Sequence, residues 1–234
     1  MNEASTWRLD VPVLAGDTIV APGAYRVQLQ RSAETTCKLL ANGSSQALGS
    51  NADGQIDGAL GKCAKPTKKL AVEWRKKGAA VLGNQPAQIV VQFGDSEWVG
   101  DVTVLGHKEL KLGAWKGIVH AVPAALVEAG PVPVATLAKG DQNWNVVLDK
   151  DKVKLVPWMA APTEQFGFGA VVGPDAAAIV EGKVEPLDGA VDKPLEVVEA
   201  IRGKSEKGTL TLEIAYGSKR LGLVFAEPKG KPGK

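Results

Sequence analysis

Hydrophobic and polar residues alternate along residues 208–225, and this alternation predicts a β-hairpin. Apolar residues share one parity on each arm, which is typical of strands that bury one face. Gly217 and Ser218 stand between the arms and supply a tight turn, because glycine accepts a positive φ. The apolar residues of the two arms are Leu210, Leu212, Ile214, Tyr216, Leu221, Leu223 and Phe225.

Residues 87–104 repeat this pattern at an offset of 121 residues, so that Ile89 corresponds to Leu210 and Val104 to Phe225. A strand-like run precedes each hairpin, at residues 70–74 and 195–200. The pattern favours an internal duplication. A coincidental likeness between two amphipathic hairpins is the alternative. The predicted fold is all-β, with two tandem antiparallel β-sandwich-like modules at residues 1–105 and 106–234, related by duplication.

The remaining segments fit the same fold class. Residues 35–66 show no sustained period, so we expect irregular structure there. Residues 113–126 fit either a short helix or a bent strand, and Gly182 is predicted to mark a bulge. Further strands are predicted at residues 7–13 and 19–30, with a turn at Pro22-Gly23, and at residues 132–137 and 144–151, with a turn at Lys139-Gly140-Asp141.

Composition is that of a globular protein, with 44% hydrophobic and 23% charged residues among 234. No apolar run is long enough for a membrane helix. A net charge of +2 gives no reason to expect a polyanionic partner. Seven Lys and Arg residues nevertheless gather between residues 62 and 77. Solvated lysines on a strand edge are favoured over a nucleic-acid patch.

The two cysteines, Cys37 and Cys63, predict a disulfide that closes a loop rich in glycine and polar residues. Such a bridge would contribute about 3 kcal/mol by restricting the unfolded chain. Two free buried thiols are the alternative, and they would be the rule in a reducing compartment. The first residues are polar and show no signal peptide, as would also hold for a mature exported protein with an added methionine.

Several short motifs resemble an uncharacterised family of exported bacterial proteins. They are residues 2–6 (NEAST), residues 21–25 (APGAY), residues 144–151 (WNVVLDKD), residues 184–188 (VEPLD) and the hairpin from Gly208. Asp149 stands where the family has asparagine, and residues 35–66 replace the tryptophan strand in the first half. The resemblance implies an all-β fold and a periplasmic or extracellular location. The family has no established activity to carry over, and we expect no cofactor.

Catalytic constellations are weak in this sequence, so we expect a protein that is not an enzyme. Only His107 and His120 are available, without acidic or cysteine neighbours at metal-binding spacing. One surface histidine and one packed histidine are the expected pair. No glycine-x-serine-x-glycine elbow and no phosphate-binding loop occurs.

Asn51, Asp53 and Asp57 match the middle of a calcium-binding loop, because the oxygen ligands Asn51 and Asp53 alternate and Gly54 follows for the sharp turn. The first acid and the final bidentate carboxylate are missing. A plain Asp-Gly turn is therefore favoured over calcium binding.

Six tryptophans occur, and most tryptophans of β-sandwiches pack in the core. Trp98, beside the turn-like residues 94–97, and Trp158, beside a proline, are the candidates for exposure and for stacking on a ligand. Two functions follow. The first is a non-catalytic interaction module that docks on a protein partner in an envelope or extracellular assembly. The alternative is a carbohydrate-binding module that uses exposed tryptophans, with calcium as a further option.

Overall fold

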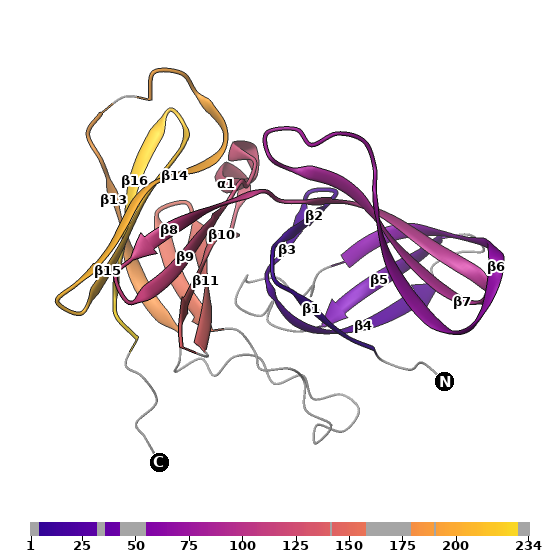
Figure 1. The fold of residues 1–234 in the computed structure, drawn as a ribbon. Helices are drawn as coiled ribbons and strands as arrows, with labels where there is room; N and C mark the ends of the chain where they lie inside the picture. The colour runs from indigo at the N-terminus through magenta and orange to yellow at the C-terminus, as the bar shows by residue number, and fades with distance from the viewer. Residues whose placement is uncertain are drawn as a thin grey trace, which may run out of the picture. The chain divides into compact units, whose positions relative to one another are not determined.

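The computed structural model describes residues 5–31, 36–42, 55–140, 142–157, 179–189 and 191–228. These residues form two compact units that meet in the sequence between Gly106 and His107. Each unit is built on one antiparallel sheet (Figure 1), so the predicted all-β class is confirmed. No helix in the described part of the chain is both long and apolar enough to cross a membrane.

The first unit contains a seven-stranded sheet with the strand order β1-β4-β5-β6-β7-β2-β3. Its strands are β1 (Ser5–Leu9), β2 (Val13–Ala15), β3 (Thr18–Val20), β4 (Gly23–Arg31), β5 (Thr36–Asn42), β6 (Gln55–Lys76) and β7 (Gln85–Val104).

Trp98 lies at the centre of this unit and is fully buried. Gly58 and Gly100 pair across β6 and β7, and a Cβ atom on either glycine would overlap the indole ring. The two glycines therefore make room for the largest side chain of the core. The buried residues packed in this core are Val13, Ala15, Val20, Tyr25, Ile56, Ala87, Ile89, Val91, Trp98 and Val102.

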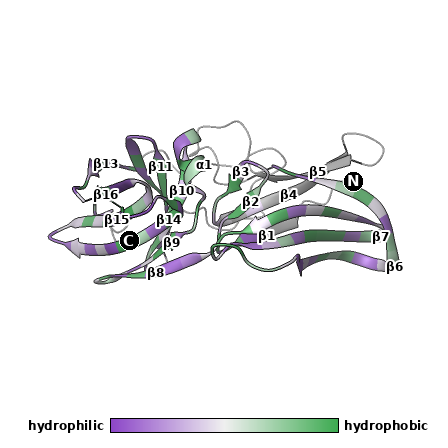
Figure 2. Ribbon diagram, turned by 90° about the horizontal axis from the view of Figure 1, so that it is seen from above, coloured by the Kyte–Doolittle hydropathy of each residue, from purple (hydrophilic) through white to green (hydrophobic). Residues whose placement is uncertain are grey.

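β6 and β7 form an antiparallel ribbon of 22 and 20 residues. Figure 2 shows hydrophobic and hydrophilic residues alternating along it. The pairing shifts register between Lys62 and Ala71, opposite Gly94, whose φ of +62° marks an irregularity within the strand. Two predictions are therefore wrong. Residues 87–104 form one strand rather than a hairpin, and the segment expected to be irregular is strand at residues 36–42 and 55–66.

The second unit contains a nine-stranded sheet with the order β14-β15-β16-β13-β12-β11-β10-β9-β8. The end strands β14 and β8 lie side by side, and Lys108 Nζ donates to the carbonyl of Ala200 at 3.3 Å, so the sheet curls into a nearly closed barrel. The elements are β8 (His107–Leu112), β9 (Trp115–His120), α1 (Ala124–Ala129), β10 (Val132–Lys139), β11 (Gln142–Asp149), β12 (Lys152–Pro157), β13 (Val180–Pro186), β14 (Leu195–Glu206), β15 (Thr209–Gly217) and β16 (Lys219–Ala226).

Two predicted hairpins are confirmed in this unit. β15 pairs with β16 around Gly217, which has a φ of +52°, and β10 pairs with β11 around Gly140. Residues 113–126 contain both alternatives, since strand β9 is followed by α1 after Pro123. The buried faces carry the alternating apolar residues, so the period-two pattern placed these strands correctly.

Gly182 does not mark a bulge, because β13 pairs with both neighbours in continuous register there. A Cβ atom at this position would lie 2.5 Å from the ring of Phe225, which is buried. We therefore expect Gly182→Val to destabilise the second unit by about 1–3 kcal/mol through overpacking. Urea unfolding measures this, with Gly130→Ala as a control, because Gly130 has an extended backbone and open space around its Cα. Equal unfolding midpoints for wild type and Gly182→Val would contradict the packing role.

The structure does not show the tandem duplication. The two sheets differ in strand number and order. Residues 87–104 are a single strand whereas their expected counterpart is a hairpin, so the offset of 121 residues joins segments of different structure.

Candidate functional site

The distal part of β6 has only one strand neighbour among the residues that the structure describes. β5 pairs with β6 from Gln55 to Ala59, and beyond that point β7 alone pairs with β6. Within the described residues, the other edge of β6 is therefore unpaired up to Lys76. An unpaired edge is a row of backbone donors and acceptors available to another strand.

The direction of those backbone groups follows from the ladder. Lys77 N donates to the carbonyl of Pro86 at 2.9 Å, so these two residues form a hydrogen-bonded pair. In an antiparallel ladder such pairs alternate with pairs that are not hydrogen-bonded. The register that pairs Trp74 with Ile89 and Val72 with Val91 therefore turns the N–H and C=O groups of Val72 and Trp74 away from β7.

Large apolar side chains are exposed along the same segment. The exposed fraction is 41% for Leu70, 40% for Val72, 45% for Trp74 and 67% for Phe93. We call these four residues the apolar row. Because Val72 and Trp74 lie opposite core residues of β7, the apolar row continues the inner face of the sheet into solvent. An exposed apolar patch on an otherwise polar surface is typical of an interaction site.

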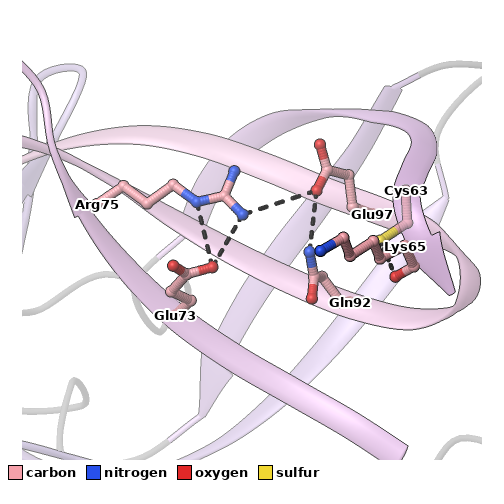
Figure 3. A network of polar contacts seen from close by, with 6 residues as sticks. All are labelled: Cys63, Lys65, Glu73, Arg75, Gln92 and Glu97. Carbon is pink, nitrogen blue, oxygen red and sulfur yellow. Dashed lines mark hydrogen bonds and ion pairs between the residues drawn. The ribbon is translucent and has the colours of Figure 1, made fainter. Parts of the chain in front are cut away.

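The other face of the ribbon carries a polar network (Figure 3). Arg75 Nη2 lies 2.8 Å from Glu73 Oε2 and 4.0 Å from Glu97, to which Gln92 Nε2 donates at 3.3 Å. The hydrogen bond that Arg75 donates to Glu73 is the main cause that raises the pKa of Arg75. The ribbon therefore exposes apolar side chains on one face, and on the other face Arg75 pairs with Glu73 and Glu97.

Exposed lysines flank the apolar row on β6. Lys77 is paired with Asp101 at 2.8 Å. Five others have no acidic side chain within ion-pair distance in the described part of the chain: Lys62, Lys65, Lys68, Lys69 and Lys76. Their exposed position along a strand edge agrees with the prediction from sequence.

The histidines are distributed as predicted. His107 is exposed and His120 is fully buried in the second unit. His120 Nε2 lies 3.0 Å from Thr136 Oγ1, which donates to Asn145 Oδ1 at 3.4 Å. Thr136 therefore accepts from the imidazole, and Nδ1 is left without a hydrogen-bond partner in the structure. Burial lowers the pKa of His120 to about 3, so this histidine is a neutral core residue without access to a substrate.

A second polar cluster surrounds Glu227 in the second unit. Its carboxylate accepts from the hydroxyl of Ser205 and, at 3.2 Å, from Trp115 Nε1. Lys139 lies 3.6 Å from the same carboxylate and 5.1 Å from the centroid of the Trp115 ring. The Ser205 hydrogen bond is the main cause that lowers the pKa of Glu227. Since the members of this cluster bind one another, it secures the end of β16 and has no free catalytic group.

The predicted stacking site at Trp98 is wrong, because this indole is buried in the core of the first unit. The turn expected beside it is part of β7. Trp158, Asn51 and Asp53 lie outside the described residues, so their predicted roles remain predictions. Asp57 is exposed in β6 opposite Lys38 and accepts from Gln55 Nε2 at 3.1 Å. In the described part of the chain, no group of three or more acidic, histidine or cysteine side chains could hold a metal ion.

The structure also argues against the predicted disulfide. Cys63 is free, and its Sγ donates to the carbonyl of Lys65 at 2.8 Å. Cys37 on β5 lies opposite Gly58 on β6. Gly58 precedes Cys63 by five residues along β6. At about 3.3 Å per residue this places the two cysteines much farther apart than the roughly 7 Å between Cα atoms that a disulfide spans.

We expect native protein prepared without reductant to react at Cys63 with a maleimide reagent, because this thiol is partly exposed on β6. Peptide mass analysis identifies the labelled residue, and Cys63→Ser provides the control. A Cys37–Cys63 cross-linked peptide in place of the label would restore the disulfide.

No sequence pattern identifies the apolar row as exposed. Alternation predicts a buried face for Leu70, Val72 and Trp74. The structure shows that no described part of the chain covers these side chains. Comparisons with protein-family models, curated proteins and solved structures found no match.

Proposed function

We propose that this protein is a non-catalytic interaction module that docks on a protein partner through the distal β6–β7 ribbon. The observation that carries the proposal is the apolar row beside an unpaired strand edge. Exposed aromatic side chains such as Trp74 are typical of the residues that supply most of the binding free energy when a partner excludes water from them. Its place in an exported or envelope-associated assembly is part of the same proposal and rests on the family resemblance.

The described surface supports binding better than chemistry. His120 is buried and neutral because burial lowers its pKa, and the Glu227 carboxylate is held by its own neighbours. The charged groups of β6 from residue 62 to residue 76 are lysines, Glu73 and Arg75, and Arg75 pairs with Glu73 and Glu97. A reaction would need an acid, a base or a nucleophile placed beside a substrate site.

Among the tryptophans that the structure describes, the carbohydrate alternative depends on Trp74, since Trp98 is buried. Trp74 is flanked by aliphatic side chains on an open strand. Sugar-binding sites need polar groups that fix the hydroxyls around an aromatic ring, and the polar network of the ribbon lies on the opposite face. Protein docking is therefore the better supported function.

A photoreactive amino acid at position 72 tests this proposal. Position 201 is a matched control, because Ile201 of the second unit is 38% exposed and Val72 is 40% exposed. In extract of the source organism, position 72 is expected to cross-link one protein that unlabelled wild-type protein displaces and unlabelled Trp74→Ser does not. Equal cross-linking at both positions, or failure of wild-type protein to compete, would contradict the proposal.

A further inference from the structure

We infer that the ribbon binds an extended acidic polypeptide segment, which adds as a strand to the free edge of β6 at residues 70–76. This inference rests on the proposed function and specifies its binding mode and the chemistry of the partner. The segment carries apolar side chains at alternate positions and carboxylates at both of its ends.

Backbone geometry supports strand addition. The N–H and C=O groups of Val72 and Trp74 point away from β7, and no described strand receives them. An added strand satisfies both sets of groups at once, as in other cases of peptide binding at a sheet edge. A globular surface without a free strand edge of its own would leave these groups to water.

Side-chain chemistry fixes the alternation of the partner. A strand beside β6 places every second side chain on the face of Leu70, Val72 and Trp74, where apolar groups are favoured. Its other side chains lie beside Glu73 and Arg75, which already pair with each other at 2.8 Å. On that face, the middle of the partner segment therefore requires side chains that are polar but uncharged.

The exposed lysines of β6 indicate negative charges at both ends of the partner segment. Lys68 and Lys69 precede the apolar row and Lys76 follows it, all exposed and without an acidic partner in the described residues. From Lys68 to Lys76 the strand spans roughly 26 Å at ~3.3 Å per residue, which is the length of a short peptide strand. A second copy of this chain on the same edge would bring lysines against lysines, so charge favours an acidic partner over self-association.

The probe is the peptide Glu-Glu-Thr-Val-Thr-Val-Thr-Val-Glu-Glu with a fluorescent label, measured by anisotropy against the full chain. We expect saturable binding that weakens as salt is raised, because the end charges are exposed. The same peptide with lysine in place of glutamate is expected to bind at least about tenfold more weakly. N-methylation of the amides on one edge of the peptide is expected to cause a similar loss, because it removes ladder hydrogen bonds.

The double substitution Lys68→Glu and Lys69→Glu reverses the charge at one end of the site. It is expected to weaken binding of the acidic peptide and to strengthen binding of the lysine peptide. Lys193→Glu with Lys207→Glu in the second unit is the matched control, since both lysines are exposed there. Neither pair lies in a core, so circular dichroism is expected to be unchanged in both variants.

Four results would overturn the inference. They are absence of peptide binding, equal binding of the two peptides, insensitivity to N-methylation, and self-association through β6 in sedimentation. Binding of a single-stranded oligonucleotide in place of the acidic peptide would identify the lysines as a nucleic-acid patch and would also overturn it. If position 72 still cross-links a protein in extract while the peptide fails, the inference is wrong and the proposed function stands.

Discussion

Trp98→Ala is expected to destabilise the first unit by about 3–5 kcal/mol, because the substitution leaves a large cavity at the centre of its core. Gly58 and Gly100 flank the ring, and neither has a side chain that could fill the space. The buried residues described around the ring are mostly smaller side chains such as valine, alanine and isoleucine, which cannot replace the lost contacts. Most or all of the stability of a small domain would be lost.

Trp74→Ala is the matched control for this substitution. It removes the same side chain from a site that is 45% exposed, so we expect a loss below about 1 kcal/mol. Hydrogen exchange at increasing urea, followed on peptides from β2 and β7, measures the stability of the first unit by itself. Similar losses for the two variants would show that Trp98 is not the centre of this core.

Stability of the second unit is expected to fall as the pH drops from about 6.5 towards 3. Burial is the main cause that lowers the pKa of His120 to about 3 in the folded state, and the nearby His107 lowers it further. The unfolded chain has a histidine pKa of about 6.5 and so binds more protons than the folded chain in this window. Folding then loses up to about 1.4 kcal/mol per pH unit, and above pH 6.5 this contribution is complete.

His120→Asn isolates that effect. The amide cannot ionise but keeps a donor towards Thr136, whose Oγ1 lies 3.0 Å from the imidazole. We expect lower stability at neutral pH and a flatter pH dependence below 6.5, measured by urea unfolding at each pH. His107→Asn on the paired position of β8 is the surface control and is expected to keep most of the wild-type slope. An unchanged slope in His120→Asn would assign the acid sensitivity to carboxylates.

The sequence predicts much of the second unit, because its strands alternate and their turns contain glycine. The hairpins around Gly140 and Gly217 have the predicted partners and the positive φ that glycine allows. The prediction of a bulge at Gly182 is wrong, since sequence spacing does not reveal that the ring of Phe225 lies over this glycine.

The first unit was harder to predict for a physical reason. β6 is exposed over most of its length on both faces, so its residues show no burial period. Gly94 interrupts β7 with a positive φ without ending it, and a local pattern read this residue as part of a turn. The offset between two apolar patterns consequently suggested a repeat that the strand pairing does not show.

The candidate site was also only partly predictable. The lysines near residues 62–77 were correctly assigned to a strand edge, but the exposed tryptophan is Trp74 rather than Trp98. Which apolar face is covered depends on strands distant in the sequence. The pairing of β6 with β5 ends at Ala59, and within the described residues this leaves the edge beside the apolar row open.

Amide hydrogen exchange of β6 is the most direct measurement of the central claim. In free protein, the amides of Val72 and Trp74 are expected to exchange faster than those of Glu73 and Arg75, which face β7. In the complex with the protein that cross-links at position 72, exchange of Val72 and Trp74 is expected to slow by at least about tenfold. Unchanged exchange at these two amides, with protection elsewhere in the chain, would contradict docking at the ribbon.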